Sequence, residues 1–346
     1  MRILVFLLGL VLALPLALLS FLTFSVPITT SGMLTLIGCW LVTATGLCAP
    51  WQKKYALGVG IIGVVLVLGV FAARFVLTTR SDTLELVTLP GEGSGRLLTR
   101  LFDERDVVLY ALPVARTLGL VTRQEFNTAP ETFEQIYAEI ATAEGMVPSP
   151  FLTTYLLAQS PRRFDLLVLE PDIENPDSAL VFLHGFGGNF TLQCWLVGQT
   201  AQDLGILTIC PATRFDGYWW GEYGKRTLET TLDYLKARGV QHVFLAGLSN
   251  GGVGASRLAL DVAGEIDGLI LISGADPGAE PSGIPALVIH ATGDERIPVS
   301  TARRYAEQAG ELGTYVEYAG DHFLLAKRAD EVLPEIQAWL FAQSAP

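Results

Sequence analysis

The chain has 346 residues, of which 50% are hydrophobic and 17% charged, and its formal net charge is −12. Residues 1–80 contain five basic residues and no Asp or Glu, a charge of +5, so residues 81–346 carry −17. An acidic body repels a phosphate backbone, which argues against nucleic-acid binding. Four cysteines without a CxxC pair and four dispersed histidines argue against a disulfide scaffold, a zinc ribbon or a metal cluster, and we expect neither a metal nor another cofactor.

Three apolar segments in the first 80 residues are candidates for transmembrane helices, at about 3–24, 32–49 and 55–73. The first contains no charged residue and is long enough, as a helix, to cross the roughly 30 Å of a bilayer. It could instead be a cleaved signal peptide, but it exceeds the usual apolar region of such peptides and no convincing cleavage site follows it. A third possibility is that all three are buried helices of a soluble protein. We predict three spans.

The few positive charges predict the orientation of these spans. Arg2 and the Lys53-Lys54 turn favour the cytoplasmic side, which places the uncharged loop at 25–31 and the acidic body outside. Arg74 and Arg80 follow the third span and reduce this asymmetry. Loss of the first span as a signal peptide would leave the body on the same side. We therefore expect a multi-pass protein of the cell membrane whose body is extracytoplasmic.

The segment between the spans and the main body has two predicted parts. Residues 89–95, with three glycines, are typical of a flexible linker, and residues 97–160 have helical patterns. A capping box from Thr128 to Glu131 predicts a helix start, and the helix would end at Gly145.

From residue 164 onward, short apolar runs alternate with helical stretches. Apolar strands separated by crossover helices predict a mainly parallel sheet with both faces covered, an α/β fold. In such sheets the functional residues lie beyond the carboxyl ends of the strands. The chain therefore divides into a membrane anchor at 1–80, a linker with helices at 81–163 and a catalytic domain at 164–346. The predicted strands lie at 164–170, 179–185, 205–211, 242–248, 268–274, 285–291 and 314–320.

The apolar run 242–248 leads directly into Ser249, within Gly-Leu-Ser-Asn-Gly at 247–251. A strand, a tight glycine-flanked turn and a helix form the setting in which a nucleophilic serine is exposed. The position after a strand makes Ser249 the predicted nucleophile, rather than a bystander in a glycine-rich turn.

A serine nucleophile needs a base that is oriented by an acid. Two later strand ends supply these groups: Asp294 follows the run at 285–291, and His322 follows the run at 314–320. Asp321 and Glu295 are the competing carboxylates, but Asp321 adjoins the histidine and Glu295 lies across the turn. We predict a catalytic triad of Ser249, His322 and Asp294.

The segment His-Gly-Phe-Gly-Gly-Asn at 184–189 follows another apolar run. A glycine-rich turn leaves backbone N–H groups free to stabilise an oxyanion, and we assign this role to the N–H groups of Phe186 and Asn250. His184 is expected to stabilise the turn rather than to act in catalysis. His290 lies within a strand and is expected to be a packed, hydrogen-bonded core residue.

Residues 164–342 resemble the α/β-hydrolase superfamily. The resemblance rests on HGFGGN as the oxyanion turn, GLSNGG as the nucleophile elbow, GDERIPV as the acid turn and GDHF as the histidine loop. No long lid lies between the elbow and the acid, which makes the chain most similar to the dienelactone-hydrolase and carboxylesterase branch. The resemblance implies the α/β-hydrolase fold and says nothing about residues 97–160 or the apolar segments.

An aromatic segment at 214–223 follows the strand at 205–211. Trp219 and Trp220 could line an apolar substrate pocket or simply pack the loop. Arg214 could bind a substrate carboxylate or pair with Asp216 or Glu222.

The predicted function is hydrolysis of carboxylic esters, either small molecules or lipids, by a serine hydrolase tethered to the lipid bilayer. An acyltransferase or a serine peptidase would use the same triad, and a non-catalytic scaffold is the third alternative. The sequence leaves open whether Cys194 and Cys210 form a disulfide, which an oxidising compartment would permit.

Overall fold

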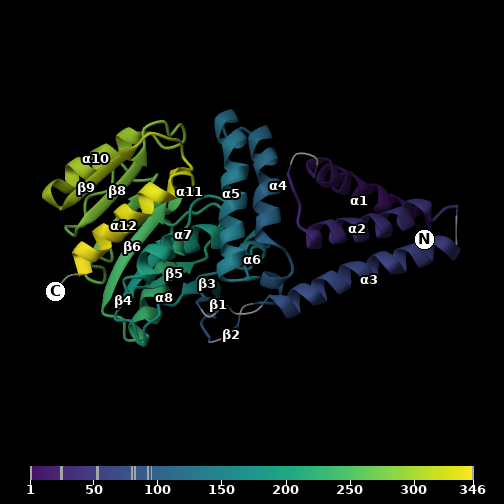
Figure 1. The fold of residues 1–346 in the computed structure, drawn as a ribbon, viewed down its shortest axis with the longest axis horizontal. Helices are drawn as coiled ribbons and strands as arrows, with labels where there is room; N and C mark the ends of the chain where they lie inside the picture. Colours follow the sequence, from purple (N-terminus) through teal and green to yellow (C-terminus); the bar gives the residue numbers. More distant parts are fainter. Residues whose placement is uncertain are drawn as a thin grey trace. The chain divides into compact units, whose positions relative to one another are not determined.

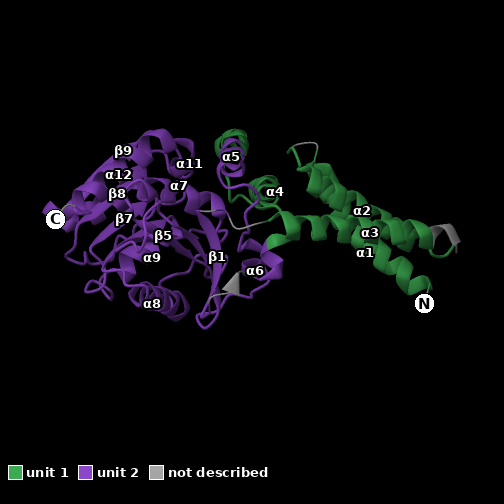
Figure 2. Ribbon diagram, turned by 60° about the horizontal axis from the view of Figure 1, so that its bottom comes forward, with its two compact units in different colours: residues 1–79, 100–134 green, residues 80–99, 135–346 purple. Residues whose placement is uncertain are grey.

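The computed structural model describes residues 2–23, 26–51, 54–78, 81, 83–91, 93–94 and 96–344 (Figure 1). The chain forms two compact units (Figure 2). The first comprises residues 1–79 and 100–134, and the second comprises residues 80–99 and 135–346. The units interleave in sequence, whereas the predicted boundaries at 80 and 163 divided the chain in simple succession.

Three apolar helices dominate the first unit: α1 (Arg2–Leu22), α2 (Thr30–Cys48) and α3 (Lys54–Leu77). Each is long and apolar enough to cross a membrane, as the sequence predicts. Many of their large apolar side chains are exposed, which suits a hydrocarbon environment rather than water. The α1 and α2 backbones approach closely where Gly9 faces Gly46, because small residues permit such packing in membranes.

Polar side chains join these helices to α4 (Glu104–Thr117) within the same unit. The Asp106 carboxylate accepts hydrogen bonds from the backbone N–H of Thr29 at 2.9 Å and from its hydroxyl at 2.5 Å. Arg74, near the end of α3, pairs with Asp103 at 3.0 Å and donates to Ser31 at 3.3 Å. The loop before α2, the end of α3 and the start of α4 therefore lie together.

The next helix, α5 (Arg123–Ala143), begins earlier than predicted. Its capping box is Thr122 and Glu125: the Thr122 N–H donates to the Glu125 carboxylate at 2.7 Å, and the Glu125 N–H donates to the Thr122 hydroxyl at 3.2 Å. The predicted start at Thr128 is wrong, because that Thr lies inside the helix and its hydroxyl donates to the Gln124 carbonyl at 3.0 Å. Both Thr-x-x-Glu sequences fit the capping-box pattern. Pro130 also favours the later start, because proline suits the first turn of a helix, yet it lies in the interior of α5.

The predicted linker at 89–95 is also wrong where the structure describes it. Strand β1 (Leu84–Leu89) and strand β2 (Gly93–Ser94) form an antiparallel hairpin, while residues 92 and 95 lie outside the described residues. β1 also pairs along its whole length with β3 (Phe164–Leu169). The Pro and Gly residues thus mark a turn between strands, so the sheet begins 80 residues before the expected start of the catalytic domain.

The main sheet has the strand order β2-β1-β3-β5-β4-β6-β7-β8-β9. All seven strands predicted from residue 164 onward are present. In the strand order given above, each neighbouring pair from β5 through β4, β6, β7 and β8 to β9 is parallel. The remaining bounds are β4 (Ser178–Leu183), β5 (Leu207–Pro211), β6 (His242–Leu248), β7 (Gly268–Ile272), β8 (Ala286–Ala291) and β9 (Gly313–Tyr318).

Helices cover both faces of this sheet. One face packs against α8 (Glu222–Ala237), α9 (Asn250–Leu258) and α10 (Val299–Ala309), whose apolar residues belong to one core with alternate strand residues. The other face packs against α7 (Thr191–Gln202) and α12 (Ala329–Ser344). The structure thus confirms the predicted α/β-hydrolase class of fold. The short elements are η1 (Leu97–Arg100), α6 (Phe151–Tyr155), η2 (Gly310–Leu312) and α11 (Leu324–Lys327).

A disulfide joins Cys194 in α7 to Cys210 in β5, and both residues are buried. It ties the helix that follows the turn at 184–190 to a central region of the sheet. Cys39 and Cys48 in α2 are free thiols.

Candidate active site

Ser249 occupies a sharp turn between β6 and α9. Its φ of 56° is positive, a conformation that costs energy for any residue with a side chain. The turn is possible because glycines surround it. A Cβ at Gly251 would lie 1.9 Å from the Leu183 carbonyl oxygen, and one at Gly247 would lie 2.3 Å from the Gly251 carbonyl oxygen. The elbow predicted from the sequence is therefore a packing requirement as well as a motif.

The three predicted catalytic side chains form one hydrogen-bonded chain. His322 Nε2 lies 2.8 Å from Ser249 Oγ, and His322 Nδ1 lies 2.6 Å from Asp294 Oδ2. With the ring proton on Nδ1 donated to the carboxylate, Nε2 is an acceptor for the serine hydroxyl. The residues come from the ends of β6, β8 and β9, so the parallel sheet brings them together from distant parts of the sequence.

The Asp294 carboxylate is buried but well supplied with donors. Its Oδ1 accepts the backbone N–H groups of Arg296 at 2.9 Å and Ile297 at 3.1 Å. Burial raises the pKa of Asp294, but hydrogen bonds from His290 and His322 and the charge of His322 lower it more, so the pKa lies below its ordinary value. The acid therefore stays ionised and can hold the imidazole ring.

His290 contacts Asp294, the predicted catalytic acid, and the sequence did not predict this contact. It is fully buried in β8, as expected for a core residue, and its Nε2 donates to the Ile297 carbonyl at 2.9 Å. The same nitrogen lies 3.4 Å from Asp294 Oδ2. His290 thus fixes the turn that carries the acid. Only the fold of that turn brings the two side chains together, so their spacing in the sequence gave no signal.

The turn after β4 packs against the nucleophile. A Cβ at Gly185 would lie 3.0 Å from the Ser249 Cβ, so the backbone that leads into Phe186 passes directly beside the serine. In the described part of the turn, the Phe186 N–H makes no backbone hydrogen bond. Asn250 is the first residue of α9, where helical N–H groups lack a partner within the helix. Phe186 and Asn250 thus belong to the segments that adjoin Ser249, and their role as oxyanion donors stays a prediction.

His184 stabilises this turn, as predicted. Its Nδ1 donates to the Gly185 carbonyl at 2.8 Å, and its Nε2 accepts the Thr213 N–H at 3.2 Å. The Trp219 indole donates to the His184 carbonyl at 2.8 Å. Burial lowers the pKa of His184 to about 4, so the ring is neutral at physiological pH.

The predicted substrate-contacting residues take different positions. Trp219 is fully buried in the core, which favours the alternative in which it packs the loop over the one in which it lines a substrate pocket. The sequence could not distinguish it from its neighbour, because both follow the same strand. Trp220 contacts the Tyr218 ring, with centroids 4.5 Å apart, and lies under the Arg257 guanidinium. The Arg214 side chain is half exposed, with its Nε 3.8 Å from the Asp216 carboxylate.

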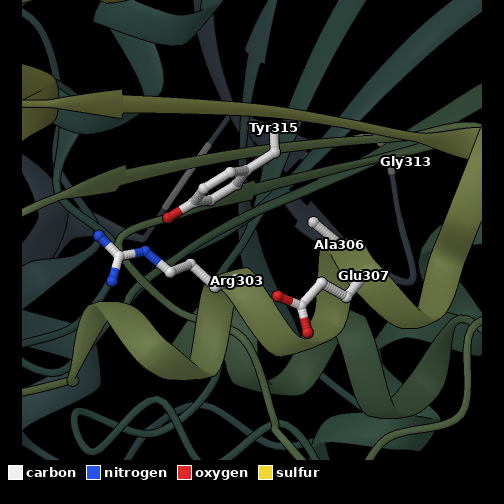
Figure 3. Close-up of a pocket in the computed structure, with 5 residues that line it drawn as sticks. All are labelled: Arg303, Ala306, Glu307, Gly313 and Tyr315. Carbon is white, nitrogen blue, oxygen red and sulfur yellow. The ribbon is translucent and has the colours of Figure 1, made fainter.

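None of these residues lines the surface hollow of about 360 Å³ that lies between α10 and β9 (Figure 3). It is lined by Arg303, Ala306, Glu307, Gly313 and Tyr315. Gly313 begins β9, whereas the catalytic residues follow the carboxyl ends of their strands. The Arg303 side chain pairs with Glu317 at 2.8 Å, so its charge is already balanced. We assign this hollow no part in catalysis.

Among the described residues, no group of three or more His, Cys, Asp or Glu side chains is arranged to hold a metal ion. The described side chains at Ser249 comprise its hydroxyl, the imidazole ring of His322 and the carboxylate of Asp294, joined by hydrogen bonds.

Neither a protein-family model nor a curated protein matches the sequence. Among solved structures, Est1E from Butyrivibrio proteoclasticus is similar over 53% of this chain and 96% of its own, with 16% identity and a TM-score of 0.47. An α/β serine hydrolase homologue from Coxiella burnetii covers 53% of this chain and 94% of its own, with 18% identity and a TM-score of 0.45. XC6422 from Xanthomonas campestris, described as an α/β serine hydrolase without a lid, covers 54% and 92%, with 21% identity and a TM-score of 0.44.

The environment of His184 predicts a pH dependence of stability. Its pKa is about 4 in the folded chain and 6.5 in an ordinary setting, so between these values the unfolded chain binds more protons. The free energy of unfolding should therefore fall as pH falls from about 6.5 to about 4. We expect His184→Gln to reduce this fall, as measured by thermal unfolding of the detergent-solubilised chain at pH 7 and pH 4.5.

His242→Gln is the matched control, because the His242 side chain is 58% exposed. It should retain the pH dependence of the unsubstituted chain. Equal pH dependence in His184→Gln and the unsubstituted chain would contradict the assignment.

Proposed function

We propose that the chain is a membrane-anchored serine hydrolase that cleaves carboxylic esters through an acyl-enzyme on Ser249. The observation that carries this proposal is the continuous hydrogen-bonded chain from Ser249 through His322 to Asp294. In acyl transfer these groups act together. The buried ionised acid orients the imidazole ring, and the ring accepts the proton of the strained serine.

The reaction begins when the Ser249 hydroxyl attacks the ester carbonyl carbon and gives its proton to His322 Nε2. The carbonyl oxygen becomes an oxyanion, which accepts hydrogen bonds from the N–H groups of Phe186 and Asn250. His322 then gives the proton to the leaving alcohol as the carbon–oxygen bond breaks, which leaves an acyl-enzyme. Water, deprotonated by His322, attacks this ester and releases the acid, and the proton returns to Ser249.

Asp294 supports both halves of the reaction. Its charge stabilises the imidazolium form of His322, and its Oδ2 keeps the ring proton on Nδ1. The N–H groups of Arg296 and Ile297 hold Oδ1, so the carboxylate cannot rotate away.

Ser249→Ala removes the nucleophile. We expect ester hydrolysis by the purified full chain to fall to the background rate, measured with p-nitrophenyl acetate. Ser256→Ala is the matched control, since Ser256 lies in α9, the helix that follows Ser249, and its hydroxyl donates to the Val253 carbonyl. Turnover by Ser249→Ala at the unsubstituted rate would refute the proposed function.

Asp294→Asn tests the orientation of the ring. The backbone donors at Oδ1 select the amide oxygen of the new side chain, which turns its NH₂ group toward His322 Nδ1. Two donors then face each other, so the ring takes the other tautomer and cannot accept the serine proton. We expect kcat to fall by roughly 10⁴, as the equivalent change does in the Ser-His-Asp triad of a serine protease.

Glu295→Gln is the control for this substitution, because it makes the same chemical change one residue away. It should retain kcat within a few-fold. A loss in Glu295→Gln equal to that in Asp294→Asn would mean that the acid has been wrongly assigned.

We propose further that the catalytic unit is extracytoplasmic. The Cys194–Cys210 disulfide supports this placement, because disulfides persist mainly in oxidising compartments. The basic residues Arg2, Lys53 and Lys54 favour the opposite side of the membrane.

Reporter fusions test this orientation. Alkaline phosphatase, which requires an oxidising compartment, should be active when fused after Pro346 and inactive when fused after Lys54. A fluorescent protein that matures only in the cytoplasm should give the reverse pattern. Cytoplasmic activity of the fusion after Pro346 would overturn the proposed orientation.

A further inference from the structure

Large apolar side chains are exposed close to the proposed catalytic serine. Tyr155 ends α6 and is 46% exposed, Leu156 and Leu157 follow it at 58% and 70%, and Phe186 in the oxyanion turn is 53% exposed. We call these four residues, together with the half-buried Phe215, the apolar shelf. All five belong to the second compact unit.

Ring contacts join the three aromatic residues of the shelf, and Leu156 and Leu157 follow Tyr155 directly in the chain. Tyr155 and Phe215 are stacked, with centroids 6.1 Å apart and planes inclined by 18°. Phe215 in turn contacts Phe186 edge to face, with centroids 6.0 Å apart. The aromatic surface therefore runs without a break from α6 to the oxyanion turn.

One end of the shelf lies at the nucleophile. Phe186 follows Gly185, where an added Cβ would lie 3.6 Å from Ser249 Oγ. Backbone bonding fixes this arrangement, because the Gly187 N–H donates to the Phe215 carbonyl at 2.7 Å. The Asn250 side chain donates to the Asp216 carbonyl at 2.8 Å, which ties the segment that carries Phe215 to the residue after the serine.

The other end of the shelf is held in a conformation that keeps leucine at the surface. Leu157 has a φ of 56°, which a glycine would adopt freely and a leucine adopts at a cost. Its N–H donates to the Thr154 carbonyl at 3.1 Å, and the Tyr223 hydroxyl donates to the nearby Gln159 carbonyl. Strained residues persist where surrounding structure enforces them, often at ligand-binding sites.

We propose that the apolar shelf binds the hydrocarbon chain of the acyl group, so that the substrates are esters of long-chain carboxylic acids. This inference rests on the proposed function. An ester carbonyl at Ser249 sits beside Phe186, and its acyl chain can extend over Phe215 and Tyr155 to Leu157. Covering these side chains removes apolar area from water, which favours longer chains.

The occupant follows from position and chemistry. The shelf adjoins the oxyanion turn, so the group that covers it is attached to the reacting carbonyl. It consists of aromatic and aliphatic surface, with its polar backbone groups at Gly187, Leu157 and Gln159 already hydrogen-bonded. The three apolar helices also suit a membrane, where long-chain esters partition.

The test compares p-nitrophenyl acetate with p-nitrophenyl octanoate, using the full chain in lipid nanodiscs. The longer acyl chain covers more apolar area of the open shelf, so kcat/KM for octanoate should exceed that for acetate by roughly tenfold or more. In Leu157→Gly and in Tyr155→Ser, we expect the octanoate-to-acetate ratio to fall several-fold. Leu157→Gly removes the side chain and relieves the strained φ, so it should not impair folding.

Leu312→Ser is the control, because Leu312 is 44% exposed and precedes β9 at the opposite end of the parallel strands. Its ratio should equal that of the unsubstituted chain. If acetate is hydrolysed but neither shelf variant changes the ratio, the shelf assignment is overturned and the proposed function stands. If neither ester is hydrolysed by the unsubstituted chain, both proposals fail.

Discussion

The sharp turn at Ser249 is the constraint on which the rest of the catalytic unit depends. A residue with a side chain has a positive φ there, and the turn is held only because β6, β4 and α9 pack around it with no room for Cβ atoms at Gly247 and Gly251. The cost of that conformation is met by the buried parallel sheet, whose neighbouring strands also carry the acid and the base. A fold that relaxed this turn would lose the serine's position and the two N–H groups beside it together.

Around that turn, buried polar groups are satisfied in a way that fixes their protonation. Burial lowers the pKa of His184 and keeps its ring neutral, although the hydrogen bond to the Gly185 carbonyl acts in the opposite direction. For Asp294 the hydrogen bonds outweigh burial: two backbone N–H groups and two histidines contact the carboxylate and keep it ionised. These contacts give the proposed base, His322, a single orientation between the carboxylate and the serine.

The local pattern of the sequence was enough to predict the seven later strands, because each is an apolar run. It also selected Ser249, His322 and Asp294 at strand ends, and the structure brings these three side chains into hydrogen-bonding contact. It failed where local signals were ambiguous. Thr122 and Thr128 both begin Thr-x-x-Glu, and only tertiary structure selects the first; Pro90 and its glycines indicated a linker, although β1 and β2 pair there. Trp219 and Tyr155 show the same limit, since burial of one and exposure of the other depend on how distant segments pack.

The chain joins three helices that are long and apolar enough to cross a membrane to a unit with the α/β-hydrolase fold, and on these features we base the proposal of a hydrolase held at a bilayer. The central claim is that Ser249 is activated by its neighbours. Mass spectrometry of the intact chain treated with a fluorophosphonate tests it most directly. We expect a single covalent adduct, on the peptide that contains Ser249, when the folded chain is treated, and no adduct when the chain is denatured before treatment. An adduct on another serine, or none, would contradict it.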